Sequence, residues 1–246
     1  MNENIFGFSL NIGIFAGGSI SFTGKTAHES ALGGSEYCVV SMAESLARRG
    51  HRVSVFTLYS DEVFGQNVAI EYNGVNYLSA KKTWRDVSYS SHWDVFIVSR
   101  DYSILSNTMI NSKLLLLWCH DILTDPDTFR EHIHRADKIF CISQYQKNQY
   151  LNQLTDERTG KCTLEPHHIT LTRNGIDLKL IEKAVSWNGY NILGQHKGKR
   201  DDPTFIYTSR PERGLFYLLR DIWPQVVNLI PNAKLKVAFY DVSQEL

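Results

Sequence analysis

Two arginines lie in a turn where an anion is expected to bind. The segment Thr208-Ser209-Arg210-Pro211-Glu212-Arg213-Gly214 follows a short apolar run, Phe205-Ile206-Tyr207, and precedes a helical pattern that begins at Leu215. At such a strand-to-helix turn, backbone N–H groups point outward and the helix dipole favours negative charge. Guanidinium groups match phosphate oxygens, and they are unfavourable beside that dipole unless an anion completes the site. The spacing predicts a phosphate site at Arg210 and Arg213; the alternative is two surface charges.

A histidine follows the most apolar run of the chain. Residues Leu114 to Cys119 are almost wholly apolar, as in a parallel strand that is buried on both faces, and His120-Asp121 comes directly after them. In open α/β sheets, ligands bind beyond the carboxyl ends of the strands. We therefore expect His120 to hydrogen-bond a ligand. The alternative is a histidine whose hydrogen bonds are satisfied by its neighbours.

Gly33 and Gly34 open a helical pattern and could admit a ligand to the backbone. Without Cβ atoms, a phosphate or a sugar can approach the amides at the start of that helix. The alternative is a tight turn before a helix. On their own the two interpretations are balanced, and the arginine turn favours the first.

Other nucleotide-binding patterns are not supported. Gly24-Lys25-Thr26 is similar to the end of a P-loop, but Ser19 stands where the first glycine of that motif is needed. We expect residues Gly17 to Leu32 to form a loop near a ligand instead. No GxGxxG sequence indicates a dinucleotide site.

The elements that would position these residues alternate between strand and helix. Apolar runs predict strands at Asn11–Ala16, His51–Leu58, Val75–Leu78, Asp94–Val98, Leu114–Cys119, Lys138–Ile142, Ile169–Thr172, Phe205–Tyr207 and Leu235–Phe239, with helical patterns between most of them. This alternation is typical of an α/β fold with a doubly wound parallel sheet. We expect a Rossmann-like lobe at residues 1–187, a linker at 188–202, and the beginning of a second Rossmann-like lobe at 203–246.

Composition narrows the class of protein. The 246 residues carry 26 basic and 26 acidic side chains, so a nucleic-acid binder that relies on net charge is not expected. No apolar run approaches the roughly 18 residues of a membrane helix, and no signal peptide is indicated. The four cysteines form no CxxC pair, so a zinc site is not expected. We expect them to be buried free thiols in a reducing compartment.

Five segments together resemble the retaining GT-B glycosyltransferases of family 4. They are Leu32-Gly33-Gly34-Ser35-Glu36 with the helix end at Ala47–Val53, Trp118-Cys119-His120-Asp121, Lys138–Ser143, Arg173-Asn174-Gly175-Ile176-Asp177, and Ser209–Leu215. Their order covers nearly the whole chain.

The resemblance implies a role for each matching residue. Gly33 and Gly34 would approach the donor phosphate or the transferred sugar, and Asn174 would belong to the same substrate site. His120 would contact the sugar and support the developing oxocarbenium charge. Arg210 and Arg213 would hold the diphosphate and assist its departure. The family usually has Lys at the position of Arg213. It also usually has a longer gap after the first arginine.

The expected reaction is transfer of a hexose from a nucleotide-diphosphate sugar to a glycan or lipid-linked acceptor, with retention of configuration and without a metal. The family's second lobe also carries two glutamates separated by seven residues, for which this chain has no room before Leu246. We therefore expect a truncated donor lobe that needs a further segment or a partner chain. The alternatives are a non-catalytic glycan-binding lobe and one half of a split transferase. The expected location is cytoplasmic, or peripheral at a membrane.

Overall fold

The computed structural model describes residues 7–17, 20–30, 32–84, 91–106, 110–175, 178, 182 and 203–238. The chain divides into two compact units, Met1–Gly175 and Ile176–Leu246. The linker expected at 188–202 lies outside the described residues. So does most of the helix that the sequence predicts from about Leu178 to Val185, after a cap at Asp177. The expected lobe boundaries therefore stay predictions.

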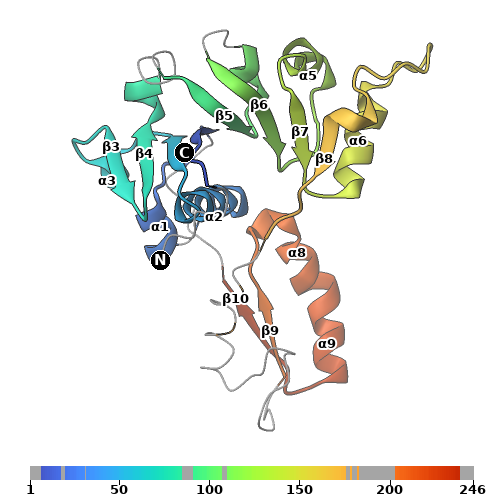
Figure 1. Cartoon of the computed structure of the whole chain (residues 1–246). Helices are drawn as coiled ribbons and strands as arrows, with labels where there is room; N and C mark the ends of the chain where they lie inside the picture. The colour runs from blue at the N-terminus through green and yellow to red at the C-terminus, as the bar shows by residue number, and fades with distance from the viewer. Residues whose placement is uncertain are drawn as a thin grey trace. The chain divides into compact units, whose positions relative to one another are not determined.

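The first unit is built on an eight-stranded sheet (Figure 1). Its strands are β1 (Asn11–Ala16), β2 (Arg52–Thr57), β3 (Ala69–Tyr72), β4 (Val75–Ser79), β5 (Trp93–Ser99), β6 (Ser112–Cys119), β7 (Lys138–Cys141) and β8 (Ile169–Leu171). They lie in the order β3-β4-β2-β1-β5-β6-β7-β8, and every neighbouring pair is parallel except β3 and β4. From β1 the chain winds first to one side and then to the other, so the prediction of a doubly wound α/β fold is confirmed.

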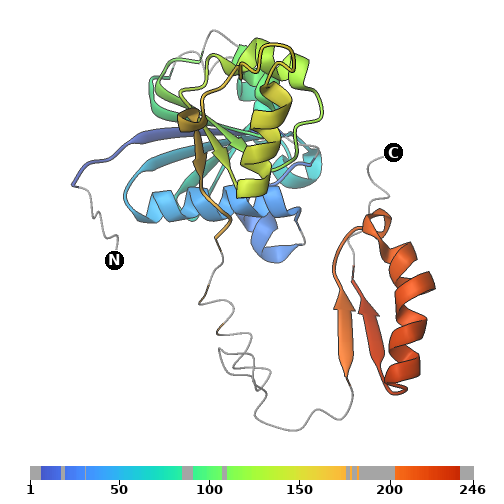
Figure 2. The ribbon, with the colours of Figure 1, turned by 90° about the vertical axis from the view of Figure 1, so that its right-hand side faces the viewer.

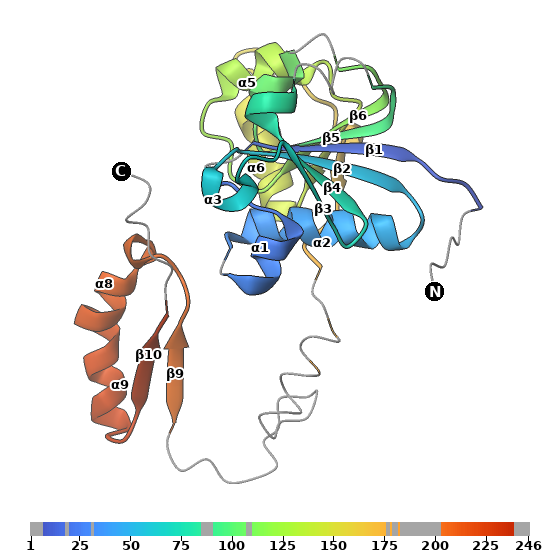
Figure 3. The same cartoon turned by 90° about the vertical axis from the view of Figure 1, so that its left-hand side faces the viewer.

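The helices of the first unit cover both faces of this sheet. They are α1 (Gly24–Glu29), α2 (Gly34–Arg48), α3 (Asp61–Phe64), α5 (Pro126–Ile133) and α6 (Gln144–Leu154), with 3-10 turns at Tyr102–Ser106 and Pro166–His168. Helix α2 packs on one face, and α5 and α6 pack on the other (Figures 2 and 3). Gly50 ends α2 with a φ of 89°, as a C-terminal glycine does.

Strand β6 shows why its sequence is apolar throughout. Leu115, Leu117 and Cys119 lie in the core beneath α5 and α6. Leu116 and Trp118 lie in the core beneath α2. Because successive side chains of a strand point to opposite faces, a strand between two cores needs an apolar residue at every position.

Helix α1 and strand β3 are among the elements that were not anticipated. The expected loop between Gly17 and Leu32 contains helix α1, because Thr23 caps it and forms a reciprocal capping box with Thr26. Strand β3 pairs antiparallel with β4 through a turn at Asn73 and Gly74, whose φ angles are 50° and 77°. Asn-Gly is a strong hairpin signal, so this strand could have been predicted from the sequence.

All four cysteines are free thiols. Cys119 and Cys141 are buried, as expected, and they are register partners on β6 and β7. Cys38 and Cys162 are only half-buried, so the expectation of four buried thiols was wrong for these two.

The second unit is small and open. Strands β9 (Thr204–Tyr207) and β10 (Lys234–Val237) form a parallel pair, and the chain between them is helical. A 3-10 turn at Pro211–Arg213 precedes α8 (Leu215–Tyr217), a π-helical turn at Leu218–Ile222, and α9 (Trp223–Leu229). Pro224 has no N–H to donate back along the helix, which accounts for the widened turn before it. No residue in 203–238 is buried.

Among the described residues, no helix is both long and apolar enough to span a bilayer.

Candidate active site

The sheet reverses its winding between β1 and β5, and this position is where open α/β sheets bind ligands. The two strands are paired in parallel, from Ile12 opposite Val95 to Phe15 opposite Val98. Their carboxyl ends therefore lie at the same edge of the sheet. Gly17 follows β1 and Arg100 follows β5.

A pocket of about 380 Å³ opens at this edge. Its wall comes from the residues that follow β1, β5 and β6 and from one residue of α6. The lining residues are Gly17, Arg100, Asp101, Tyr102, Cys119, His120, Asp121, Ile122, Leu123, Thr124 and Tyr150. This volume is within the range of small-molecule sites.

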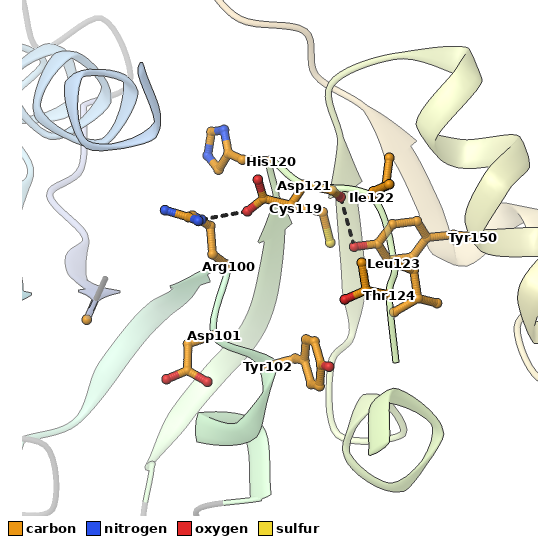
Figure 4. Close-up of a pocket in the computed structure, with 11 residues that line it drawn as sticks. Arg100, Asp101, Tyr102, Cys119, His120, Asp121, Ile122, Leu123, Thr124 and Tyr150 are labelled. Atoms are coloured by element: carbon orange, nitrogen blue, oxygen red, sulfur yellow. Dashed lines mark hydrogen bonds and ion pairs between the residues drawn. The ribbon is translucent and has the colours of Figure 1, made fainter. Parts of the chain in front are cut away.

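Arg100 lies at the edge of the pocket, paired with Asp121 (Figure 4). Its Nε donates to Asp121 Oδ2 at 2.7 Å. Its Nη1 donates to Ser35 Oγ at 3.2 Å and lies 3.4 Å from Glu36 Oε1. The side chain is 37% exposed, while that of Glu36 is 7% exposed. Arg100 has a φ of 69°, an uncommon conformation for a residue with a Cβ, and functional sites are one place where such conformations persist.

Glu36 explains why glycine precedes α2. Its carboxylate accepts a hydrogen bond from Ser35 Oγ at 2.9 Å and turns back toward the start of the helix. A Cβ at Gly33 would overlap Glu36 Oε2, whereas a Cβ at Gly34 would meet nothing within 4 Å. A side chain at Gly33 would therefore force the buried Glu36 carboxylate to move. Gly34 leaves open space at the first turn of α2.

His120 lies at the end of β6 with its ring against Trp118, at a centroid distance of 4.5 Å. Its Nε2 is buried and has no hydrogen-bond partner among the described residues. Burial lowers the pKa of His120, and nearby Arg100 lowers it further, although Asp121 and Glu36 oppose this. The imidazole is therefore neutral near pH 7, and a buried nitrogen without a partner is a group that calls for an explanation.

The loop after β6 is fixed by side chains of α6. Gln146 Nε2 donates to the Asp121 carbonyl at 2.6 Å, and Tyr150 OH donates to the same oxygen at 3.3 Å. Gln149 forms hydrogen bonds with both the N–H and the carbonyl of Leu123. Burial raises the pKa of the Cys119 thiol beneath this loop. The loop that carries His120 and Asp121 is thus held in one conformation before any ligand binds.

The arginine turn of the second unit adopts the predicted strand-to-helix arrangement. The turn begins after β9, where Tyr207 OH donates to the Arg210 carbonyl at 2.7 Å. Gly214 has a φ of 107° and precedes α8. Arg210 is half-buried and lies 3.6 Å from Glu212, and Arg213 is exposed.

The predicted site residues therefore fall into three groups. Gly33, Gly34 and His120 lie at the switch-point edge of the first unit, where Gly33 contacts the Glu36 that pairs with Arg100. Asn174 is exposed after β8 and does not line the pocket. Arg210 and Arg213 belong to the second unit.

The sequence analysis did not single out Arg100 and Glu36, which the structure pairs at the edge of the pocket. Arg100 directly follows an apolar strand, which is the same signal that drew attention to His120. Glu36 gave no such signal, because an acidic residue in the first turn of a helix is ordinary. Among the described residues, no three His, Cys, Asp or Glu side chains converge as a metal site would require.

The fold is that of GT-B glycosyltransferases. Sucrose-phosphate synthase from Thermosynechococcus elongatus superposes with a TM-score of 0.61 at 14% identity, over 95% of this chain and 63% of that enzyme. The catalytic domain of starch synthase IV from Arabidopsis thaliana has a TM-score of 0.55 at 11% identity. The superposition covers 94% of this chain and 69% of that one. An α,α-trehalose 6-phosphate synthase from Burkholderia multivorans has a TM-score of 0.57 at 11% identity. The superposition covers 97% of this chain and 67% of that one.

The sequence identifies the family. Residues 32–180 match the profile of Glycosyltransferase Family 4, so the chain belongs to this family. The match includes Gly33, Gly34, His120 and Asn174. No curated protein sequence matches the chain. The chain spans less than two thirds of the length of the sucrose-phosphate synthase.

Proposed function

We propose that this chain is the acceptor-side lobe and the beginning of the donor lobe of a retaining hexosyltransferase. Its donor is a nucleotide-diphosphate sugar, and its acceptor is a glycan or a lipid-linked glycan. The observation that carries this proposal is the switch-point pocket, with the buried, unpartnered Nε2 of His120 in its wall.

His120 suits contact with a sugar. A neutral imidazole can accept or donate a hydrogen bond to a hydroxyl group, and a buried nitrogen without a partner gains free energy when one arrives. Close to the anomeric carbon, the same ring or its backbone carbonyl would stabilise the positive charge of an oxocarbenium-like transition state.

Arg210 and Arg213 suit the leaving group. Glycosyl transfer from a nucleotide sugar releases a nucleoside diphosphate, and guanidinium groups stabilise the charge that develops on it. Gly34 leaves the amides of α2 open to a phosphate or a sugar, and we assign Asn174 to the same substrate. We further propose that these cations replace a metal ion.

Related structures support this donor class. One related structure is of starch synthase IV bound to ADP and acarbose, and another is of a trehalose-6-phosphate protein from E. coli bound with UDP-2-fluoro glucose. A third concerns glycosyl transfer with retention by trehalose-6-phosphate synthase. The free thiols favour a reducing compartment, so we propose a cytoplasmic enzyme that is peripheral at the membrane if its acceptor is lipid-linked.

We also propose that the second unit functions with additional polypeptide, either a further segment or a partner chain. Its described residues include no buried side chain, and several large apolar residues are exposed, among them Ile206 (67%), Phe216 (62%) and Leu229 (83%). A parallel strand pair with one helical segment is too small to bury its own apolar surface. This observation favours one half of a split transferase as the second candidate function.

The test is transfer of radiolabelled hexose from UDP-, ADP- and GDP-sugars to glycan and lipid-linked acceptors. We expect His120→Ala and Arg210→Ala each to lower kcat/KM by about 100-fold or more. His134→Ala, at the exposed C-cap of α5, and Arg220→Ala, in the second unit, are the matched controls and should keep full activity. The anomeric configuration of the product, read by NMR, tests retention.

Binding measurements decide between the candidates if the chain alone gives no product. A donor-lobe fragment should still bind UDP, ADP or GDP, and Arg210→Ala should weaken that binding. A glycan-binding lobe would bind glycan without turnover and would be indifferent to Arg210→Ala. Absence of both product and nucleotide binding would overturn the transferase proposal.

A further inference from the structure

The switch-point pocket has an unusual balance of charge for a site beside a nucleotide sugar. Arg100 is the sole cationic side chain among its described lining residues, and Asp101 and Asp121 are both acidic. Burial keeps His120 neutral near pH 7, so it adds no positive charge. The pocket is therefore not cationic.

The charge of Arg100 is also already in use. Its Nε donates to Asp121 at 2.7 Å, and its Nη1 faces Ser35 and the buried carboxylate of Glu36. Two carboxylates thus offset the charge of one guanidinium, and a phosphate group would compete with them for it. Drawing Arg100 away from Glu36, whose side chain is 7% exposed, would weaken the pairing of a buried carboxylate, which is costly.

The remaining groups suit hydroxyl groups instead. Carboxylates accept hydrogen bonds and repel anions, so Asp101 can receive hydroxyl donors, although its Oδ1 already accepts from the N–H and hydroxyl of Ser103. His120 Nε2 has no hydrogen-bond partner within the part of the chain that the structure describes. Tyr102 offers an aromatic ring, and Thr124 offers a hydroxyl at the exposed edge (Figure 4). Apolar and aromatic walls with a few polar groups are typical of sites for small neutral ligands.

We propose that this pocket binds an uncharged, hydroxyl-rich sugar and discriminates against a phosphorylated one. The inference rests on the proposed function and deepens it, because it assigns the acceptor to the class of neutral sugars or neutral glycan ends. Arg100 acts in the pocket as a positioning residue that holds Asp121 and Glu36, rather than as an anion receptor.

The experiment measures equilibrium binding to the full chain, with no donor present. The probes are two equimolar mixtures, one of glucose, mannose, galactose and maltose, and one of the 6-phosphates of the same hexoses, read by saturation-transfer NMR and titration. We expect the neutral sugars to bind about tenfold more tightly at low salt, because a phosphomonoester faces like charges in the pocket. The difference should shrink at high salt, since the screening length falls from about 30 Å at 0.01 M to about 3 Å at 1 M.

Substitutions sharpen the result. Asp101→Asn should weaken the binding of neutral sugars and strengthen that of phosphorylated sugars. The ratio of the two affinities should therefore narrow by about threefold or more. Thr124→Lys, at the exposed edge, should shift the preference toward the phosphates. Asp127→Asn, on α5 outside the pocket, is the matched control and should change neither affinity.

Three results would overturn the inference. They are equal or tighter binding of the phosphorylated sugars, binding of neither mixture, and a preference that neither salt nor Asp101→Asn alters. Because no nucleotide sugar is used, these outcomes are independent of the transfer assay. A failure to transfer hexose therefore remains distinguishable from a failure to discriminate acceptors.

Discussion

At the residue scale, Arg100 and Glu36 form the pair on which the edge of the pocket depends. A buried carboxylate is tolerated where a counter-ion and hydrogen bonds compensate its lost hydration. Glu36 has both, from Arg100 Nη1 at 3.4 Å and from Ser35 Oγ at 2.9 Å. Loss of Arg100 removes the cation and leaves the carboxylate in place.

We therefore expect Arg100→Ala to lower the free energy of unfolding by about 1–3 kcal/mol, less than for a fully buried pair because Arg100 is partly exposed. The double variant Arg100→Ala with Glu36→Gln should recover much of that loss. Urea denaturation measures both. Arg48→Ala is the control, since Arg48 is 65% exposed and 3.9 Å from Glu44, and it should cost less than about 1 kcal/mol. Equal effects of Arg100→Ala and Arg48→Ala would contradict the pairing.

His120 predicts a pH dependence of stability. Burial lowers the pKa of His120 in the folded protein below the ordinary value of 6.5. Below pH 6.5 the imidazole therefore becomes protonated in the unfolded chain while it stays neutral in the folded chain. The contribution of the neutral His120 to the free energy of unfolding is present above pH 6.5 and is lost as the pH falls through the lower pKa of the folded state. Denaturant titrations at pH 7.5 and 5.5 should show a larger loss of stability for the wild type than for His120→Gln. A loss of the same size in both proteins would argue against a buried neutral imidazole.

At the element scale, the two glycines at the start of α2, Gly33 at the N-cap and Gly34 at the first helical position, are expected to differ in their tolerance of a side chain. Gly33→Ala should cost about 1–3 kcal/mol, because its Cβ would overlap the Glu36 carboxylate, which Ser35 and Arg100 hold in place. Gly34→Ala should change stability by less than about 0.5 kcal/mol, because its Cβ meets open space. Thermal or urea unfolding of the two variants checks this. Equal costs would show that the Glu36 contact does not set the requirement at Gly33.

Prediction of the elements from sequence succeeded where one signal dominated. The apolar run Leu114–Cys119 predicted a strand, and β6 spans Ser112–Cys119. Strand β3 was missed because its burial alternates weakly, with no buried residue, and the Asn73-Gly74 turn was not used. Helix α1 was missed because Gly, Ser and Thr suggested a loop, whereas Thr23 and Thr26 supply the cap.

At the scale of the whole molecule, the two units differ in how much apolar surface they bury. The first contains two buried clusters, one on each face of its sheet. The second has no buried residue in 203–238, and Ile206 and Leu229 are largely exposed. Independent folding requires a core, so only the first unit should fold by itself.

We expect a fragment of residues 1–175 to unfold cooperatively and to give a dispersed NMR spectrum. A fragment of residues 203–246 should give a collapsed spectrum, and its helical signal should be weak, because a single helical segment on two strands is marginal. Circular dichroism and heteronuclear NMR of the two fragments measure this. A cooperative transition in the shorter fragment would remove the reason for additional polypeptide.

The sequence by itself determined the fold class, the order of most strands and helices, and the positions of His120, Gly33, Gly34, Arg210 and Arg213 on turns next to strands or helices. These follow from local periodicity and from signals within a few residues, which the chain carries in linear form. The family also followed from short segments in order.

Only the tertiary structure decided which of those turns share a site. Arg100 lies 64 positions from Glu36 and 21 positions from Asp121 along the chain. The three side chains meet because β1, β5 and β6 are neighbours in the sheet. Whether Nε2 of His120 has a partner, and whether Arg100 is free to hold an anion, depend on burial and on contacts between distant segments. No local pattern encodes those quantities, because they arise from packing.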